Sequence, residues 1–170
     1  LRICHDVYTA SFFVSTDLDQ NQVASFYTGA MARARELSIA DLDPGDCALV
    51  AISPNDPEGM ARYGRECRAA GIPFLYDPSQ QVARLTGEDL ASGVKGAAIL
   101  IVNDYEMGIL TSKTGWSVDE IREQVPVVIV THGPEGSTIY LSDARSRHTR
   151  KIPAARLEKD ALDPTGVGVA

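Results

Sequence analysis

Three stretches of this chain, 48–52, 98–102 and 127–130, are apolar at every position. Such runs are typical of strands with both faces covered, because a strand with one wet face alternates apolar and polar residues. Helical patterns separate the runs, and one of them begins at a capping Asp56 and stops at Gly71. This alternation predicts an α/β protein with a doubly wound, mostly parallel sheet and helices on both faces.

Further elements extend this pattern. Between the apolar runs the sequence predicts a short strand at 74–76 and a helical stretch at 80–90 that is interrupted near Gly87. Two further helices are predicted at 104–110 and 117–124. Two antiparallel pairs are predicted outside this region. They are 11–14 with 22–27, around a polar turn, and 137–141 with 147–152.

The composition narrows the classes of partner. A chain of 170 residues with 44% hydrophobic and 23% charged residues suits one globular domain with a sizeable core. The formal net charge of −7 argues against nucleic acid or an anionic membrane as the main partner, because both would repel the chain. The longest apolar runs have the length of a strand, so we expect no membrane span. Three cysteines without metal-ligand spacing indicate reduced thiols in a cytoplasmic protein.

The chemistry is expected at the edge where the parallel strands end, because ligands of open α/β sheets collect there. Polar or turn-forming residues follow the predicted strands at 53–55, 77–79, 103–106 and 131–136. Loops are polar for other reasons as well, so position alone does not identify a site.

Asn103 and Glu106 are the most informative pair at this edge. An amide and a carboxylate one helical turn apart, at a strand-to-helix junction, can hold a hydrated Mg²⁺. Taken without further information, the residues favour a plainer interpretation, an Asn cap followed by an exposed Glu in the first turn.

Two glycine patterns can bring backbone amides close to an anion. One is Thr131-x-Gly133-x-x-Gly136, and the other lies around Gly166 and Gly168 in the last eight residues. The alternatives are an ordinary loop for the first and a flexible tail for the second. The sequence contains no G-x-x-x-x-G-K-[ST] phosphate loop. A basic cluster near the end is interpreted as a solvated strand face: Arg145, Arg147, Arg150 and Lys151.

Taken in order, these motifs resemble those of the ribokinase-like (PfkB) carbohydrate and nucleoside kinases. The resemblance runs through Asn103-Asp104-Tyr105-Glu106, Val130-Thr131-His132-Gly133 with Gly136, and Asp163-Pro164-Thr165-Gly166-Val167-Gly168. Residues 15–31 and 77–81 are similar to the adenosine kinase-like branch. The resemblance covers nearly the whole chain. It implies a single incomplete domain, 1–170, with a lid hairpin at about 10–28 and an α/β core at about 29–170. Because the chain begins with Leu1 rather than Met, we expect it to begin inside a longer one.

The resemblance implies an ATP-dependent kinase that transfers the γ-phosphoryl group to a hydroxyl of a nucleoside (adenosine-like) or of a sugar. Asn103 and Glu106 would then organise Mg²⁺, through water, and the nucleotide phosphates. Thr131, Gly133 and Gly136 would lie along the bound nucleotide.

The remaining implied roles fall at the two ends of the chain. Gly166, Val167 and Gly168 would form the anion hole for charge that develops during phosphoryl transfer. Phe13 and Asp17 belong to the implied lid, which would exclude water and enclose the acceptor. Lid strands can pair across subunits in this family, which implies a possible homodimer.

The chain departs from the family pattern at Val169. The family has an Asp directly after the second glycine of the anion hole, where it acts as a base toward the acceptor hydroxyl, and a Val side chain cannot accept a proton. Loss of a general base typically costs about 10²–10⁴ in rate. A second hypothesis is therefore a non-catalytic kinase remnant that acts as a ligand-binding or interaction module.

Overall fold

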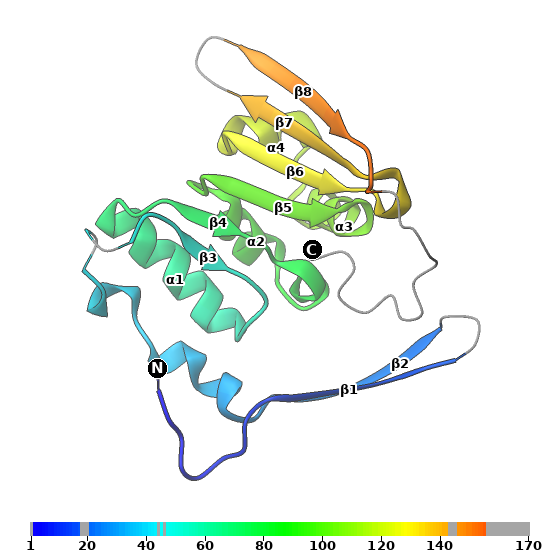
Figure 1. The fold of residues 1–170 in the computed structure, drawn as a ribbon. Helices are drawn as coiled ribbons and strands as arrows, with labels where there is room; N and C mark the ends of the chain where they lie inside the picture. The colour runs from blue at the N-terminus through cyan, green and yellow to red at the C-terminus, as the bar shows by residue number, and fades with distance from the viewer. Residues whose placement is uncertain (1, 18–20, 44, 46, 143–145, 156–170) are drawn as a thin grey trace.

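The structure is a computed structural model of the chain, and it describes residues 2–17, 21–43, 45, 47–142 and 146–155 (Figure 1). A six-stranded sheet forms its centre, with its strands in chain order: β3 (Val50–Ile52), β4 (Phe74–Tyr76), β5 (Ile99–Asn103), β6 (Val127–Thr131), β7 (Ser137–Ser142) and β8 (Arg147–Ile152). Strands β3 to β6 pair in parallel, and β7 and β8 are antiparallel to their neighbours. The predicted α/β class and mostly parallel sheet are confirmed.

Four α-helices connect the parallel strands: α1 (Pro57–Ala70), α2 (Gly87–Val94), α3 (Asp104–Thr114) and α4 (Val118–Gln124). Their ends follow from local capping. Asp56 caps α1 by accepting a hydrogen bond from the backbone N–H of Gly59 (3.0 Å), and Gly71 ends the helix with φ = 68°. Helices α2, α3 and α4 each begin with a capping box, in which a side chain and a backbone N–H three residues apart bond reciprocally.

The stretch predicted as helical at 80–90 is split in two. A 3₁₀ segment, η4 (Ser79–Ala83), comes first, and α2 then begins at Gly87. A side chain at position 87 would place its Cβ 2.0 Å from the carbonyl oxygen of Lys113, so the close approach of α3 requires glycine here. The predicted interruption near Gly87 is therefore confirmed.

The main core lies between one face of the sheet and the helices. Alternate strand residues, such as Leu100 and Val128, are fully buried together with Met60 of α1, Leu110 of α3 and Ile121 of α4. Strands β3 to β6 lie side by side in chain order, so each connecting segment moves the chain one strand further in the same direction across the sheet. Because such connections are right-handed, all of their helices lie on the same face of the sheet. The described residues thus supply the helical layer of one face, and the second layer expected from the sequence is not formed by them.

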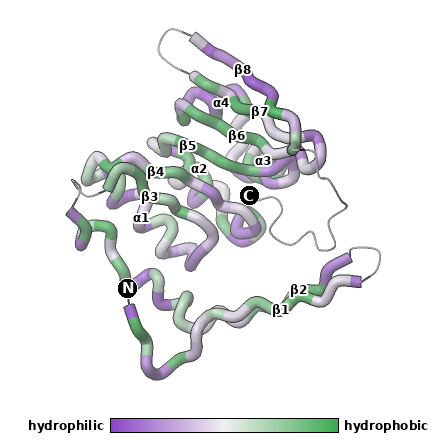
Figure 2. Tube along the Cα trace, in the orientation of Figure 1, coloured by the Kyte–Doolittle hydropathy of each residue, from purple (hydrophilic) through white to green (hydrophobic). Residues whose placement is uncertain are grey.

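A separate two-stranded sheet precedes this core. Strands β1 (Ser11–Thr16) and β2 (Gln22–Tyr27) pair antiparallel from Ser11 with Tyr27 to Thr16 with Gln22, which confirms the predicted hairpin. In Figure 1 the hairpin extends away from the six-stranded sheet, and Figure 2 shows that much of it is apolar. Two 3₁₀ segments that the sequence analysis did not predict, η1 (Gly29–Glu36) and η2 (Ile39–Asp41), connect it to β3. Among the described residues, no helix has the length and apolar character that a membrane crossing requires.

Candidate functional site

The carboxyl ends of β4, β5 and β6 bring the predicted site residues to one edge of the sheet. Asn103 is the last residue of β5 and pairs in register with Thr131, the last residue of β6. Asp77 directly follows β4, and its backbone N–H donates to the carbonyl oxygen of Ile52 at the end of β3 (2.9 Å). We call this edge, from Asp77 to the loop that follows Thr131, the rim.

Asn103 and Glu106 form the capping box of α3. The Asn103 Oδ1 accepts a hydrogen bond from the backbone N–H of Glu106 (2.8 Å), and the Glu106 Oε2 accepts one from the backbone N–H of Asn103 (2.8 Å). Asn103 and Glu106 therefore cap α3, as the plainer interpretation of the motif predicts. The cap uses the amide oxygen of Asn103 and one of the two carboxylate oxygens of Glu106, so the Oε1 of Glu106 stays outside it.

Asp77 is a rim residue that the sequence analysis did not select. Partial burial raises the pKa of its carboxyl group above the ordinary value, and the negative charge of Glu106 raises it further, while a hydrogen bond from the Ser79 backbone opposes the shift. The carboxylates of Asp77 and Glu106 repel each other, which makes it harder for Asp77 to ionise. A cation bound at this edge would offset that repulsion and favour the ionised form of both groups. The available signal was an acidic residue placed directly after a short apolar strand.

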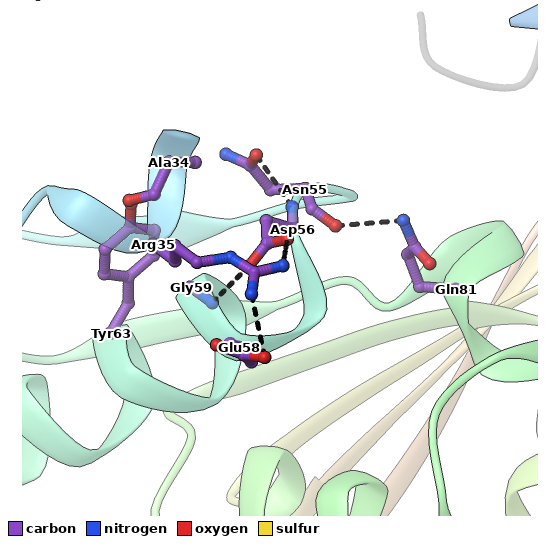
Figure 3. Close-up of polar contacts among 8 residues, drawn as sticks. All are labelled: Ala34, Arg35, Asn55, Asp56, Glu58, Gly59, Tyr63 and Gln81. Atoms are coloured by element: carbon purple, nitrogen blue, oxygen red, sulfur yellow. Dashed lines mark hydrogen bonds and ion pairs between the residues drawn. The ribbon is translucent and has the colours of Figure 1, made fainter. Parts of the chain in front are cut away.

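The segment after Asp77 is held in an unusual conformation. Ser79 has φ = 42°, the left-handed region that side chains other than glycine rarely adopt. Gln81 is buried, and its Nε2 donates to the carbonyl oxygen of Asn55 (2.9 Å), which ties the ends of β4 and β3 together (Figure 3). Within the part of the chain that the structure describes, the buried Oε1 of Gln81 has no hydrogen-bond partner. Strained backbone and unpaired polar atoms of this kind cluster at functional sites.

The glycines of the loop after β6 serve its geometry. Gly133 and Gly136 have φ of 56° and 94°, and a Cβ on Gly136 would lie 2.0 Å from the carbonyl oxygen of Ile152 on β8. The backbone N–H of His132 donates to the carbonyl oxygen of Gly136 (2.8 Å), which closes the loop around the 3₁₀ turn η5 (Gly133–Glu135). We call residues 132–136 the glycine loop.

Figure 3 shows how η1, the segment that follows the hairpin, is attached to α1. Arg35 of η1 pairs with Asp56 and with Glu58 (2.8 Å) at the start of α1, and the Tyr63 hydroxyl donates to the carbonyl oxygen of Ala34. The side chain of Asp56 is almost fully buried in this contact. The segment that follows the hairpin is therefore fixed to α1 by charged and hydrogen-bonded groups.

The structure does not bring every predicted residue to the rim. Phe13 lies exposed on β1, and Asp17, at the end of the hairpin, accepts hydrogen bonds from the backbone N–H and the Nδ2 of Asn21 (2.9 and 3.0 Å). The predicted anion hole and the position of the expected base lie outside the described residues: Gly166, Val167, Gly168 and Val169.

A family model, described as the pfkB family carbohydrate kinase, matches residues 2–168. The chain belongs to the pfkB family of carbohydrate kinases. The family resemblance inferred from the order of the motifs is thereby confirmed, and the rim is the edge on which this pfkB member gathers its polar residues.

Relatives of this pfkB chain include nucleoside kinases. The one from Methanothermobacter thermautotrophicus is 31% identical over 164 residues, which are 96% of this chain and 51% of that protein. A structure of Burkholderia thailandensis nucleoside kinase in complex with inosine is 37% identical, with a TM-score of 0.87 over 96% of this chain and 52% of that one. The same kinase in complex with ADP-inosine gives a TM-score of 0.85 at 37% identity, over 96% and 49%. The chain spans about half the length of the curated relatives it matches.

Proposed function

We propose that this pfkB chain forms the magnesium- and phosphate-binding part of an ATP-dependent kinase that phosphorylates a hydroxyl of a nucleoside. The observation that carries the proposal is the meeting of Asp77, Asn103 and Glu106 at one sheet edge, beside the glycine loop. The nucleoside kinase relatives, one of them solved with inosine and with ADP-inosine, favour a nucleoside over a sugar as the acceptor.

The rim residues fit a hydrated Mg²⁺. This ion keeps several waters and is held by one or two carboxylates together with substrate phosphates. The described residues contain no group of three or more His, Cys, Asp or Glu side chains that could hold a metal alone, so a fully protein-bound ion is not the expected form. Glu106, Asn103 and Asp77 would hold the ion through water. When bound, Mg²⁺ would offset the phosphate charge of ATP in a chain whose own net charge is −7.

The other roles follow the family pattern. The backbone of Thr131, Gly133 and Gly136 would lie along the nucleotide, and the segment 166–168 would supply amides to the charge that develops on the transferred phosphoryl group. The hairpin at about 10–28 would act as a lid on the core at about 29–170, with Phe13 and Asp17 facing the acceptor. We further propose that two copies pair through their lid strands and that the protein is cytoplasmic.

Val169 favours a second candidate function. The side chain at this position cannot take the proton of an acceptor hydroxyl, so nucleotide binding can persist while turnover is lost. A non-catalytic module that binds nucleotide or nucleoside is the alternative to the kinase.

Calorimetric titration of the chain with ATP, with and without Mg²⁺, tests the shared part of both proposals, and ADP formation in the presence of inosine separates them. Binding that requires Mg²⁺, together with ADP formation, supports the kinase. Binding without turnover supports the module, and it predicts that Val169→Asp restores measurable ADP formation. If neither ATP nor inosine binds, both proposals fail.

Two capping-box carboxylates provide a matched pair of variants. Glu106→Gln and Glu120→Gln each remove one charge at the same helical position, and a Gln preserves the cap. We expect Glu106→Gln to weaken Mg²⁺-dependent ATP binding by about tenfold or more, because ligand-shell changes typically cost about 10–100-fold. Glu120→Gln should leave binding unchanged. Equal effects from the two variants would show that the rim carboxylate has no special role.

A further inference from the structure

The ring of His132 connects three separate elements. Its Nδ1 lies 2.7 Å from the Oδ1 of Asp104, the first residue of α3, and its Nε2 lies 2.8 Å from the Oγ1 of Thr138 on β7. His132 itself directly follows β6. Both ring nitrogens are therefore engaged, each with a side chain from a different part of the chain.

The chemistry of the partners fixes the direction of these hydrogen bonds. An ionised carboxylate only accepts, so the Nδ1 of His132 donates to Asp104. In the neutral ring the Nε2 then accepts from the Thr138 hydroxyl. Thr138 is only 5% exposed, so loss of the ring would leave a largely buried hydroxyl without this partner.

The same residue closes the glycine loop through its backbone. The N–H of His132 donates to the carbonyl oxygen of Gly136 (2.8 Å), and its carbonyl oxygen accepts from the N–H of Glu135 (3.2 Å). The loop is thus closed at His132 and anchored, through the imidazole, to Asp104. That anchor is the immediate neighbour of Asn103 and lies in the same helical turn as Glu106.

We propose that His132 is a positioning residue that sets the glycine loop at a fixed distance from the Asn103–Glu106 cap. This inference rests on the proposed function, in which the loop lies along the nucleotide and the cap holds hydrated Mg²⁺. A ligand that spans both, with its phosphates between the loop and the ion, gains from the bridge, because the two halves of its site are already in place before it binds.

The test measures ATP dissociation constants with and without Mg²⁺ for His132→Ala, Asp104→Ala and the double variant. We expect each single variant to weaken Mg²⁺-dependent binding by about tenfold. We expect the double variant to be no weaker than either single one, because both remove the same bridge. The ratio of the dissociation constants without and with Mg²⁺ should fall, since the loop and the cap no longer act together. His132→Gln, which keeps one donor and one acceptor, should recover most of the loss.

Two controls make the result decisive. Asp119→Ala removes an equally exposed acid from the first turn of α4, where no histidine is bonded, and should leave ATP binding unchanged. Asp104 is 64% exposed, so Asp104→Ala tests the bridge even if His132→Ala does not fold.

If the wild-type chain binds Mg²⁺-ATP and both single variants bind it equally well, this inference is wrong while the proposed function stands. An equal loss with and without Mg²⁺ would also overturn it, because it would indicate general damage. If the wild-type chain binds no ATP, the proposed function and the inference fail together.

Discussion

Apolar side chains on one face of the central strands β5 and β6 are buried, whereas those of the β1–β2 hairpin are largely exposed. Leu100 on β5 is 0% exposed, but Phe13 on β1 and Val23 on β2 are 66% and 78% exposed. Both regions have complete strand ladders, so pairing alone does not bury a side chain. The sheet has a helical layer to cover one face, and two isolated strands have none. The difference indicates that burial in the described part of the chain is concentrated in the sheet and its helices, while the hairpin leaves its apolar side chains exposed.

The largest expected effect separates the two regions directly. Leu100→Ala should lower the free energy of unfolding by about 2–5 kcal/mol, because it leaves a cavity in the core between the sheet and the helical layer. Phe13→Ala, which removes more carbon atoms, should change it by less than about 0.5 kcal/mol, because the ring is already in water. Urea unfolding followed by circular dichroism measures both. A comparable loss from the two variants would break the comparison.

Two helical glycines test how closely the helical layer packs on the sheet. A Cβ on Gly93 of α2 would lie 2.2 Å from the ring of Tyr76, so Gly93→Ala should destabilise the chain by about 1–3 kcal/mol. Among the described residues outside the backbone of α3 itself, no atom lies within 4 Å of a Cβ on Gly108, and Gly108→Ala should stabilise the helix by up to about 1 kcal/mol. A loss of stability from Gly93→Ala together with a gain from Gly108→Ala would show that the helical layer is tightly packed at Gly93 and has free space at Gly108.

Arg35 is expected to link the stability of the two regions. Arg35→Ala leaves the buried Asp56 carboxylate without its cation and should cost about 1–2 kcal/mol. Hydrogen exchange should rise more at the hairpin and η1 than in β4 to β6. Arg65 on the exposed side of α1 is the control, since no ion pair joins it to the described residues, and Arg65→Ala should cost less than about 0.5 kcal/mol. A uniform rise in exchange would mean that the hairpin and sheet unfold as one unit.

The smallest expected effect concerns Asp77 at the rim, because partial burial of its ionised carboxyl group is unfavourable to folding. The folded-state pKa of Asp77 is raised above the ordinary 3.8, mainly by burial, so the native state binds its proton more tightly than the unfolded chain does. The contribution of this group is therefore fully present below pH 3.8 and is lost as the pH rises through the folded-state pKa. Asp77→Asn should flatten this decline and raise stability at pH 7 by roughly 0.5–1 kcal/mol, a range that allows for solvent screening. Unfolding curves between pH 3 and pH 8 measure the change, and identical profiles for both chains would contradict it.

Local signals account for what the sequence predicted well. Asp56 marks the start of α1 through its capping side chain and Gly71 marks its end through a left-handed backbone, so this helix could be placed without knowledge of its neighbours. The same holds for the cap formed by Asn103 and Glu106, which interact within one helical turn. Their proposed metal-binding role rests on the family resemblance as well as on that spacing.

Distant contacts explain what the sequence could not predict. His132 and Asp104 are 28 positions apart, and nothing near either residue indicates that they meet. The pKa of Asp77 is raised mainly by burial and further by Glu106, and both effects depend on the pairing of β4 with β5, which brings distant parts of the chain together. The sequence analysis did not predict the 3₁₀ segments after the hairpin, and contacts with the distant helix α1 stabilise them.

Strand β8 forms one outer edge of the sheet, and all six of its residues are exposed. An open edge of this kind offers unpaired N–H and C=O groups to any passing strand, which is how many sheets begin to aggregate. Here the edge carries Arg147, Arg150 and Lys151, so a second copy that approached edge to edge would meet charges of the same sign. The cluster interpreted from the sequence as a solvated strand face thus lies along an outer edge of the described sheet, where we expect its charges to oppose edge-to-edge pairing, and its removal should show first in the solubility of the chain rather than in its folding.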